Sequence, residues 1–132
     1  MNILQPPGWK KPSGYANGVM AEGAVVFVGG QIGWDEQEIF QSDALVEQVR
    51  QALKNTVSVL SQAGAGPENI ARMTWYVTDK REYLRSRREI GQVYREIIGR
   101  HYPAMTMVQV NALMEDRAKV EIETTAVLPA AT

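Results

Sequence analysis

Two carboxylates near the end of the chain are its best candidates for chemistry. Glu121 and Glu123 alternate with apolar residues in a segment, 118–127, that predicts a β-strand. Alternation places both side chains on one face of a sheet, so it does not decide which of them acts. A half-buried carboxylate can serve as a general base that positions water, or as a structural ion-pair partner. The carboxylates share their face with apolar groups, which favours the catalytic interpretation.

Two methionines lie in the preceding predicted strand, 105–113, and share one of its faces. Methionine is flexible and polarizable, so Met105 and Met107 are suited to the wall of a ligand pocket. Packing at a subunit interface explains them equally well, and both interpretations stay open.

Gly29 and Gly30 interrupt a segment rich in β-branched residues, 24–32, that otherwise predicts a strand. Glycine weakens a strand and often marks a place where a ligand or another backbone comes close. The pair could offer backbone N–H groups to a ligand, and close packing of subunits accounts for it as well.

The single histidine and the basic cluster favour structural interpretations. His101 lies at the end of a predicted helix, where a histidine commonly binds free carbonyl groups. One histidine without cysteine cannot form an ordinary zinc site, so we expect no metal and no cofactor. Basic residues crowd the start of the second predicted helix and are typical of a solvated face: Lys80, Arg81, Arg85, Arg87 and Arg88. Cations there oppose the helix dipole, which leaves open a ligand-facing role for one arginine.

The composition narrows the class of protein. The 132 residues, 45% hydrophobic and 22% charged, fit one globular domain spanning 1–132. The formal net charge of -1 lacks the basic excess of a nucleic-acid binder, so nucleic acid is not an expected partner. No apolar run reaches the length of a membrane span, and the first residues lack the pattern of a signal peptide. The chain has no cysteine, and we expect a reducing, cytoplasmic location.

Hydrophobic periodicity predicts an α+β fold with a mixed sheet and two helices on one of its faces. A short strand near Ile3 opens the chain, and segment 15–20 is expected to form a hairpin with 24–32. Ser42 is expected to cap the first helix and Asp79 the second, which would run to about residue 100. The remaining strands are expected at 71–78, 105–113 and 118–127.

The sheet face away from the helices predicts an oligomer. The uniformly small and β-branched sides of the last two strands suit packing against helices. That leaves Met105, Met107, Glu121, Glu123 and Val127 on the other side, with Trp75 or Phe27 as further candidates. A contiguous apolar patch of this kind usually marks an interface.

Five motifs in order resemble the Rid/YjgF family of imine and enamine deaminases over nearly the whole chain. They are SGYANGV at 13–19, VGGQI at 28–32, TWYVTD at 74–79, YPA at 102–104 and VEIE at 120–123. The resemblance implies a YjgF-like, chorismate-mutase-like homotrimer with small-molecule clefts between subunits. It also implies roles for three residues: Glu121 positions the attacking water, Gly30 makes a backbone contact, and Tyr15 closes the pocket from a loop.

The sequence departs from that family at the substrate clamp. Relatives place an arginine directly after Pro-Ala, where this chain has Met105, and methionine cannot pair with a carboxylate. Gly29 stands where relatives often have a hydroxyl residue, and Gly91 where they often have asparagine. We therefore expect a deaminase whose ligand is more apolar or differently charged, held by Tyr15, Gly30, Met105 and Met107.

Two other functions stay open from the sequence. One is a non-catalytic trimer that binds small molecules or acts like a chaperone. The other is an endoribonuclease or translation inhibitor, an activity attributed to some members of the family. The near-neutral charge and the lack of a histidine pair argue against the latter.

Overall fold

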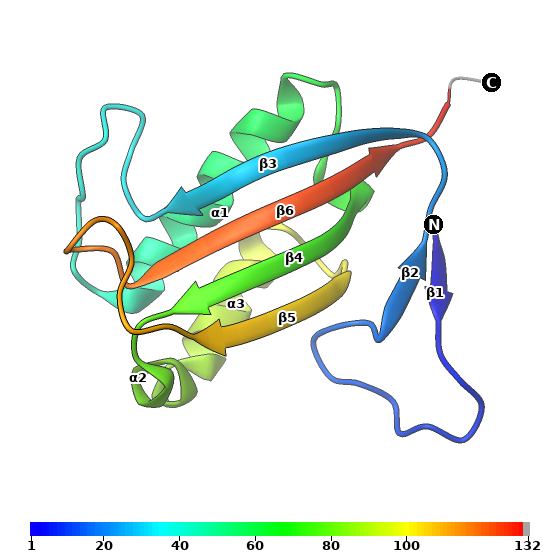
Figure 1. The fold of residues 1–132 in the computed structure, drawn as a ribbon, viewed down its shortest axis with the longest axis horizontal. Helices are drawn as coiled ribbons and strands as arrows, with labels where there is room; N and C mark the ends of the chain where they lie inside the picture. The colour runs from blue at the N-terminus through cyan, green and yellow to red at the C-terminus, as the bar shows by residue number, and fades with distance from the viewer. Residues whose placement is uncertain (131–132) are drawn as a thin grey trace.

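The structure, a computed structural model that describes residues 1–130, is built on a four-stranded sheet with the strand order β3-β6-β4-β5. A separate two-stranded unit lies near the amino terminus (Figure 1). The strands are β1 (Asn2–Leu4), β2 (Gly18–Met20), β3 (Ala24–Ile32), β4 (Ile70–Val77), β5 (Ala104–Gln109) and β6 (Val120–Leu128). The helices are α1 (Leu45–Ser61), the 3-10 turn η1 (Pro67–Asn69), α2 (Lys80–Arg85) and α3 (Arg87–Ile97).

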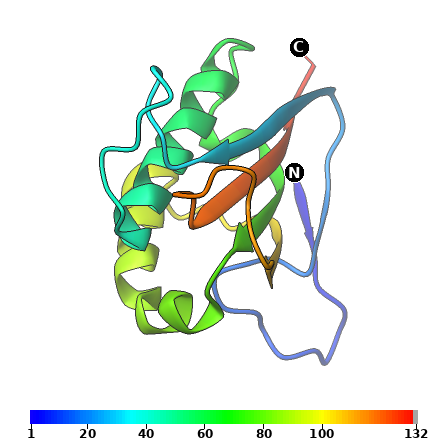
Figure 2. The same ribbon diagram turned by 60° about the vertical axis from the view of Figure 1, so that its left-hand side comes forward.

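The predicted α+β architecture is confirmed: the sheet is mixed, and α1 and α3 lie together on one of its faces (Figures 1 and 2). Strand β4 pairs parallel with β5 and antiparallel with β6, and β6 pairs antiparallel with β3. The apolar stripes of the two helices bury Leu53, Ile90 and Val93 against Trp75 and Ile122 of the sheet. No helix covers the other face, and among residues 1–130 none is long and apolar enough to cross a membrane.

The predicted hairpin between 15–20 and 24–32 is wrong. Strand β2 pairs with β1, as Asn2↔Met20 and Leu4↔Gly18, while β3 pairs with β6. The cause lies at Gly23, whose φ of 146° turns the chain between the two strands. A side chain there would also collide with the backbone of Leu128.

The prediction of two helices is also corrected, because the second is divided into α2 and α3. Asp79 caps α2 as expected, accepting hydrogen bonds from the N–H groups of Arg81 (3.0 Å) and Glu82 (3.1 Å). Ser86 then adopts φ -103° and ψ 7°, outside the helical region, and ends α2 one residue before α3 begins. Ser42 does not cap α1: the N-cap residue is Ala44, whose N–H binds the Ser42 hydroxyl at 3.0 Å.

One face assignment is reversed in β5. Met105 and Met107 lie on the helix side of the sheet, packed against the core, and Thr106 and Val108 are exposed. The register explains this, since Met107 is paired with the buried Trp75 of β4. In β6 the assignment holds: Ile122 is buried, and the two glutamates are not.

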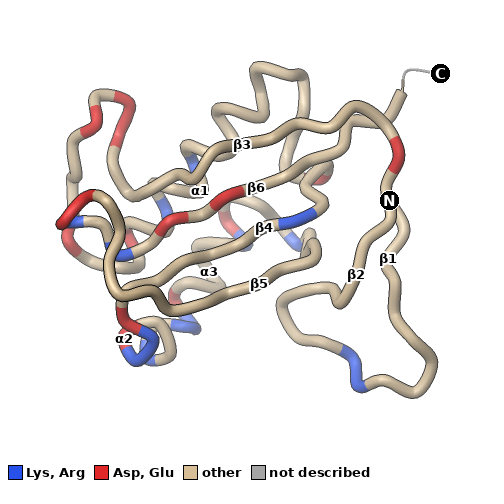
Figure 3. Tube along the Cα trace, viewed as in Figure 1, with Lys and Arg blue, Asp and Glu red and all other residues tan. Residues whose placement is uncertain are grey.

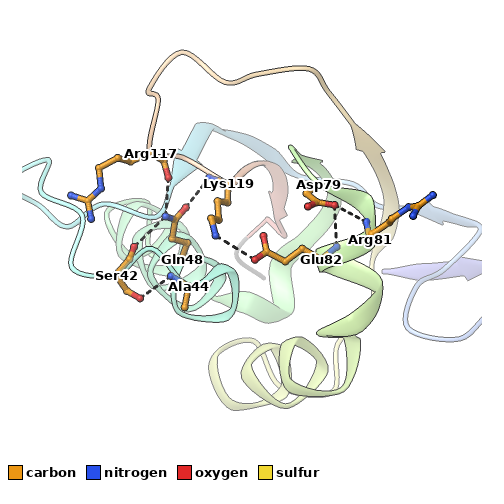
Figure 4. Close-up of polar contacts among 8 residues, drawn as sticks. All are labelled: Ser42, Ala44, Gln48, Asp79, Arg81, Glu82, Arg117 and Lys119. Carbon is orange, nitrogen blue, oxygen red and sulfur yellow. Dashed lines mark hydrogen bonds and ion pairs between the residues drawn. The ribbon is translucent and has the colours of Figure 1, made fainter.

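A buried glutamine fixes the start of β6. Gln48 of α1 is 1% exposed and donates from Nε2 to the carbonyls of Ser42 (3.1 Å) and Arg117 (3.0 Å). Its Oε1 accepts the N–H of Lys119 at 2.8 Å, and Figure 4 shows this amide between the two segments. The Lys119 ammonium in turn reaches Glu82 at 3.3 Å. The loop before Glu121 is thereby tied to both α1 and α2.

Replacing this amide should destabilise the fold. Gln48→Ala leaves two carbonyls and one N–H of the loop without partners in a buried place, which should lower the free energy of unfolding by about 2–4 kcal/mol. Urea denaturation measures the change. Gln62→Ala is the matched control, because Gln62 is exposed at the end of the same helix and should change stability little. Equal effects of the two substitutions would contradict the role of Gln48.

Candidate functional site

The expected binding residues Tyr15, Met105 and Met107 line one cavity of about 650 Å³. It opens between β5, helix α3 and the loop that precedes β2. Aromatic and thioether side chains form most of its walls, and two arginines lie among them. The other lining residues are Ser13, Gly14, Trp75, Tyr83, Leu84, Arg87, Ile90, Gly91, Tyr94, Arg95 and Tyr102. A volume of this size accommodates a small organic molecule.

Local contacts position the parts of this cavity. The loop that carries Tyr15 is attached to β5, because the N–H of Ala16 donates to the carbonyl of Pro103 at 2.9 Å. Tyr94 and Tyr102 stack with ring centroids 5.6 Å apart and planes 13° apart. The Tyr94 hydroxyl donates to the carbonyl of His101 at 2.6 Å, and burial raises the pKa of this phenol. Trp75 is buried in the wall, and its indole N–H has no acceptor among the described residues.

The other expected site residues, Gly30 and Glu121, line a different hollow of about 410 Å³ at the β3–β6 side of the sheet. Gly30 lies within an irregularity in the pairing of β3 with β6, between Val28 and Gln31. A Cβ on Gly30 would lie 2.8 Å from the Cδ of Glu121, whereas one on Gly29 would meet open space. A side chain at 30 would therefore displace the Glu121 carboxylate, whereas one at 29 would not.

The two glutamates of β6 differ in their partners. Glu123 accepts a hydrogen bond from the hydroxyl of Tyr76 at 2.8 Å, which raises the pKa of that tyrosine. Glu121 makes no hydrogen bond or ion pair with any residue in 1–130, and it projects from the sheet face that no helix covers. Figure 3 marks the acidic positions along β6 in red. The Glu121 carboxylate is therefore available to a ligand or a water molecule.

The open face of the sheet carries exposed apolar side chains. Phe27 is 79% exposed and Val25 is 51% exposed, both on β3. Phe27 lines a shallow depression that also contains Arg72, Thr74 and Glu123. The apolar patch expected here exists, but Phe27 and Val25 form it, and the methionines and Trp75 belong to the helix side.

The expected site residues therefore come together as two half-sites and not as one pocket. We call Tyr15, Met105 and Met107 the aromatic half-site, and Gly30 and Glu121 the acidic half-site. They lie toward opposite edges of the sheet, which β5 and β3 form.

His101 is engaged in a structural contact, since its Nε2 lies 2.6 Å from the carbonyl oxygen of Ile70. The partner is the start of β4 and not the helix end that the sequence predicted. Among the described residues, no group of three side chains is arranged to hold a metal ion.

Sequence reasoning missed several residues of the aromatic half-site. No sequence pattern connects Tyr83, Tyr94 and Tyr102 with the two methionines of β5, and only the folded chain places them beside β5 in the same cavity. Arg87, Gly91 and Arg95 carry a signal that could have been found, because spacings of four residues place them on one side of α3.

Comparisons with known proteins identify similar proteins over most of the chain. The family model for endoribonuclease L-PSP matches residues 10–128. A RutC family protein from Synechocystis is 34% identical over 98% of this chain and 98% of its own length. TdcF from Escherichia coli, described as a putative reactive intermediate deaminase, is 33% identical over 80% of each chain. The crystal structure of TdcF with bound serine covers 97% of this chain and 99% of its own, with a TM-score of 0.68 and 32% identity.

A second solved structure is more similar in shape. A Rid family protein of unknown function from Yersinia pestis has a TM-score of 0.85 at 26% identity, covering 96% of this chain and 98% of its own. The range that the family model matches, 10–128, includes every residue of both half-sites.

Proposed function

The chain belongs to the endoribonuclease L-PSP family, which contains the Rid/YjgF proteins, and from this premise we propose that three copies hydrolyse a reactive imine or enamine in clefts between neighbouring subunits. The reactive intermediate deaminase among its relatives supports the reaction class. The substrate is a small molecule, no cofactor takes part, and the absence of cysteine fits a reducing cytoplasm.

The separation of the two half-sites is the observation that carries this proposal. One lies toward the β5 edge and the other toward the β3 edge, so a single chain cannot enclose a ligand between them. A head-to-tail contact brings the β5 edge of one subunit to the β3 edge of the next, and such contacts close into rings. In a ring of three, each cleft combines one aromatic and one acidic half-site, and the apolar face of β3 is covered.

The acidic half-site can perform the chemistry. An imine carbon is electrophilic, and Glu121 would hold a water molecule and accept its proton as the oxygen attacks. The C–O bond forms while the C=N π-electrons move to nitrogen. Proton transfer to that nitrogen and loss of ammonia then give the carbonyl product. An enamine enters the same path after protonation at carbon.

The aromatic half-site predicts which substrates are poor. We expect little turnover of 2-aminoacrylate-type imines formed from serine or threonine, because Met105 offers such a short substrate no charged contact at the strand position where relatives have an arginine. A missing charge-assisted contact costs about 1.5–3 kcal/mol per hydrogen bond, or tenfold and more in rate. Ammonia release, with a dehydratase generating the imine, measures this. Met105→Arg should recover part of the activity, and wild-type turnover equal to that of an arginine-bearing relative would refute the expectation.

The same assay tests the function itself. Imines of larger amino acids, generated in place by an amino-acid oxidase, should be hydrolysed faster with the protein than without it. No acceleration with any imine in such a series would leave a non-catalytic binding protein as the better description. An RNA-cleaving function has less support, because His101 is held by Ile70 and no second histidine exists.

A further inference from the structure

Helix α3 presents an unusual stripe to the aromatic half-site. Arg87, Gly91 and Arg95 follow one another at intervals of four residues and all line its cavity. The Arg95 side chain turns back along the helix, so that a Cβ added at Gly91 would lie 3.3 Å from its Nη1. The absence of a side chain at Gly91 thus leaves space between the two arginines, and the Arg95 guanidinium group lies beside that space.

Two members of this stripe, Gly91 and Arg87, are unfavourable for the helix alone. Glycine in a helix interior costs about 1 kcal/mol relative to alanine. Arg87, the first residue of α3, opposes the positive end of the helix dipole. Neither arginine forms an ion pair with a residue in 1–130, although the chain forms four such pairs elsewhere. Residues whose intrinsic preference conflicts with the helix or strand in which they lie tend to mark functional positions.

The remaining walls of the cavity indicate the chemistry of the uncharged part of the ligand. Tyr83, Tyr94 and Tyr102 supply aromatic surface, with Met105 and Met107 on the strand side. Aromatic rings stack on such walls or meet them edge to face, and thioether sulfur makes favourable contacts with ring edges. Burial raises the pKa of Tyr83, and the Arg87 guanidinium partly offsets this rise, so a positive charge lies next to this surface.

We propose that Arg87 and Arg95 bind the carboxylate of a substrate whose body is a planar aromatic ring, above Gly91 in the aromatic half-site. The reaction class rests on the function proposed above, and the inference adds the substrate class: imines of aromatic 2-oxo acids. Arginine pairs with carboxylate through parallel N–H donors. The carboxylate would thus be bound at helix α3 in this chain, and not at the strand position of Met105, where relatives have an arginine.

Equilibrium binding tests this without requiring turnover. Calorimetric titrations of the full-length protein would use 3-phenylpropionate, its neutral amide 3-phenylpropanamide, and propionate. The amide differs from 3-phenylpropionate by the loss of the charge, and propionate differs from it by the loss of the ring. We expect 3-phenylpropionate to bind about tenfold tighter than either of the others, as expected for a charge-assisted contact and a stacked ring.

Three variants assign the effect to the stripe. Arg87→Gln and Arg95→Gln should each weaken binding of 3-phenylpropionate about fivefold or more and leave the amide unchanged. Arg88→Gln is the matched control, because Arg88 is an exposed neighbour that does not line the cavity, and it should change neither affinity.

The outcomes separate this inference from the proposed function. Equal affinity for acid and amide, equal loss in Arg88→Gln, or no binding of 3-phenylpropionate would overturn it. Hydrolysis of aromatic imines at wild-type rates in both arginine variants would also overturn it, while the function would stand. Arginine-dependent binding without hydrolysis of any imine would support the ligand class and remove the proposed reaction.

Discussion

Glu121→Gln is expected to slow imine hydrolysis by about 10²–10⁴-fold, the usual cost of removing a general base. Glutamine keeps the size of the side chain, and so it still fits over Gly30, but its amide cannot accept a proton from water. Glu121 has no hydrogen-bond or ion-pair partner in the described chain, so the substitution breaks no structural contact. Stability, oligomeric state and ligand affinity should therefore remain near those of the wild type.

Glu123→Gln is the control for this prediction, because it lies two residues away on the same face. It should weaken only the contact with the Tyr76 hydroxyl and retain most of the rate. Steady-state kinetics measures the rate of both variants, and light scattering measures their oligomeric state. Equal loss of activity with dissociation in both would make the two carboxylates structural, and full activity in Glu121→Gln would direct the search to another residue.

Phe27→Asp should convert the proposed trimer to monomers at micromolar concentration and abolish the proposed activity with it. A phenylalanine that is 79% exposed contributes little to the fold of one chain, so the substitution should leave the monomer folded. In the ring it would place an unpaired carboxylate in an apolar contact. Losing the buried ring and desolvating the charge should weaken association by at least about 100-fold.

Sedimentation velocity measures this effect, with Val59→Asp as the control. Val59 is also an exposed apolar residue, but it lies on α1, away from the open face of the sheet. The control should remain trimeric. A stable wild-type monomer, or a trimer that tolerates Phe27→Asp, would contradict the proposed assembly.

Periodicity predicted most elements because it reports directly on burial. The alternation of β6 correctly separated Ile122 from the two glutamates, and the apolar stripes located both helical regions. The same rule failed for β5, because alternation says which residues share a side but not which side faces the helices. Pairing of Met107 with Trp75 decides that, and this register is a contact between distant segments.

The candidate site was only partly predictable for a related reason. Motifs suggested Tyr15, Gly30 and Glu121, and strand alternation suggested Met105 and Met107, yet neither signal says which of these residues meet in one chain. The strand order β3-β6-β4-β5 separates them, and that order is a property of the folded sheet. The helix break at Ser86 and the turn at Gly23 depend on single backbone conformations, which hydrophobic patterns do not report.

The central claim is that each cleft joins the aromatic half-site of one subunit to the acidic half-site of the next, and cross-linking tests it most directly. The chain contains no cysteine, so Met107→Cys and Gln31→Cys introduce unique thiols, one in each half-site. With a short bis-maleimide, the double variant should give covalent dimers and trimers on a denaturing gel. Neither single variant should, because unlike edges meet in a head-to-tail ring. A double variant that remains monomeric, or dimers from a single variant, would contradict the account.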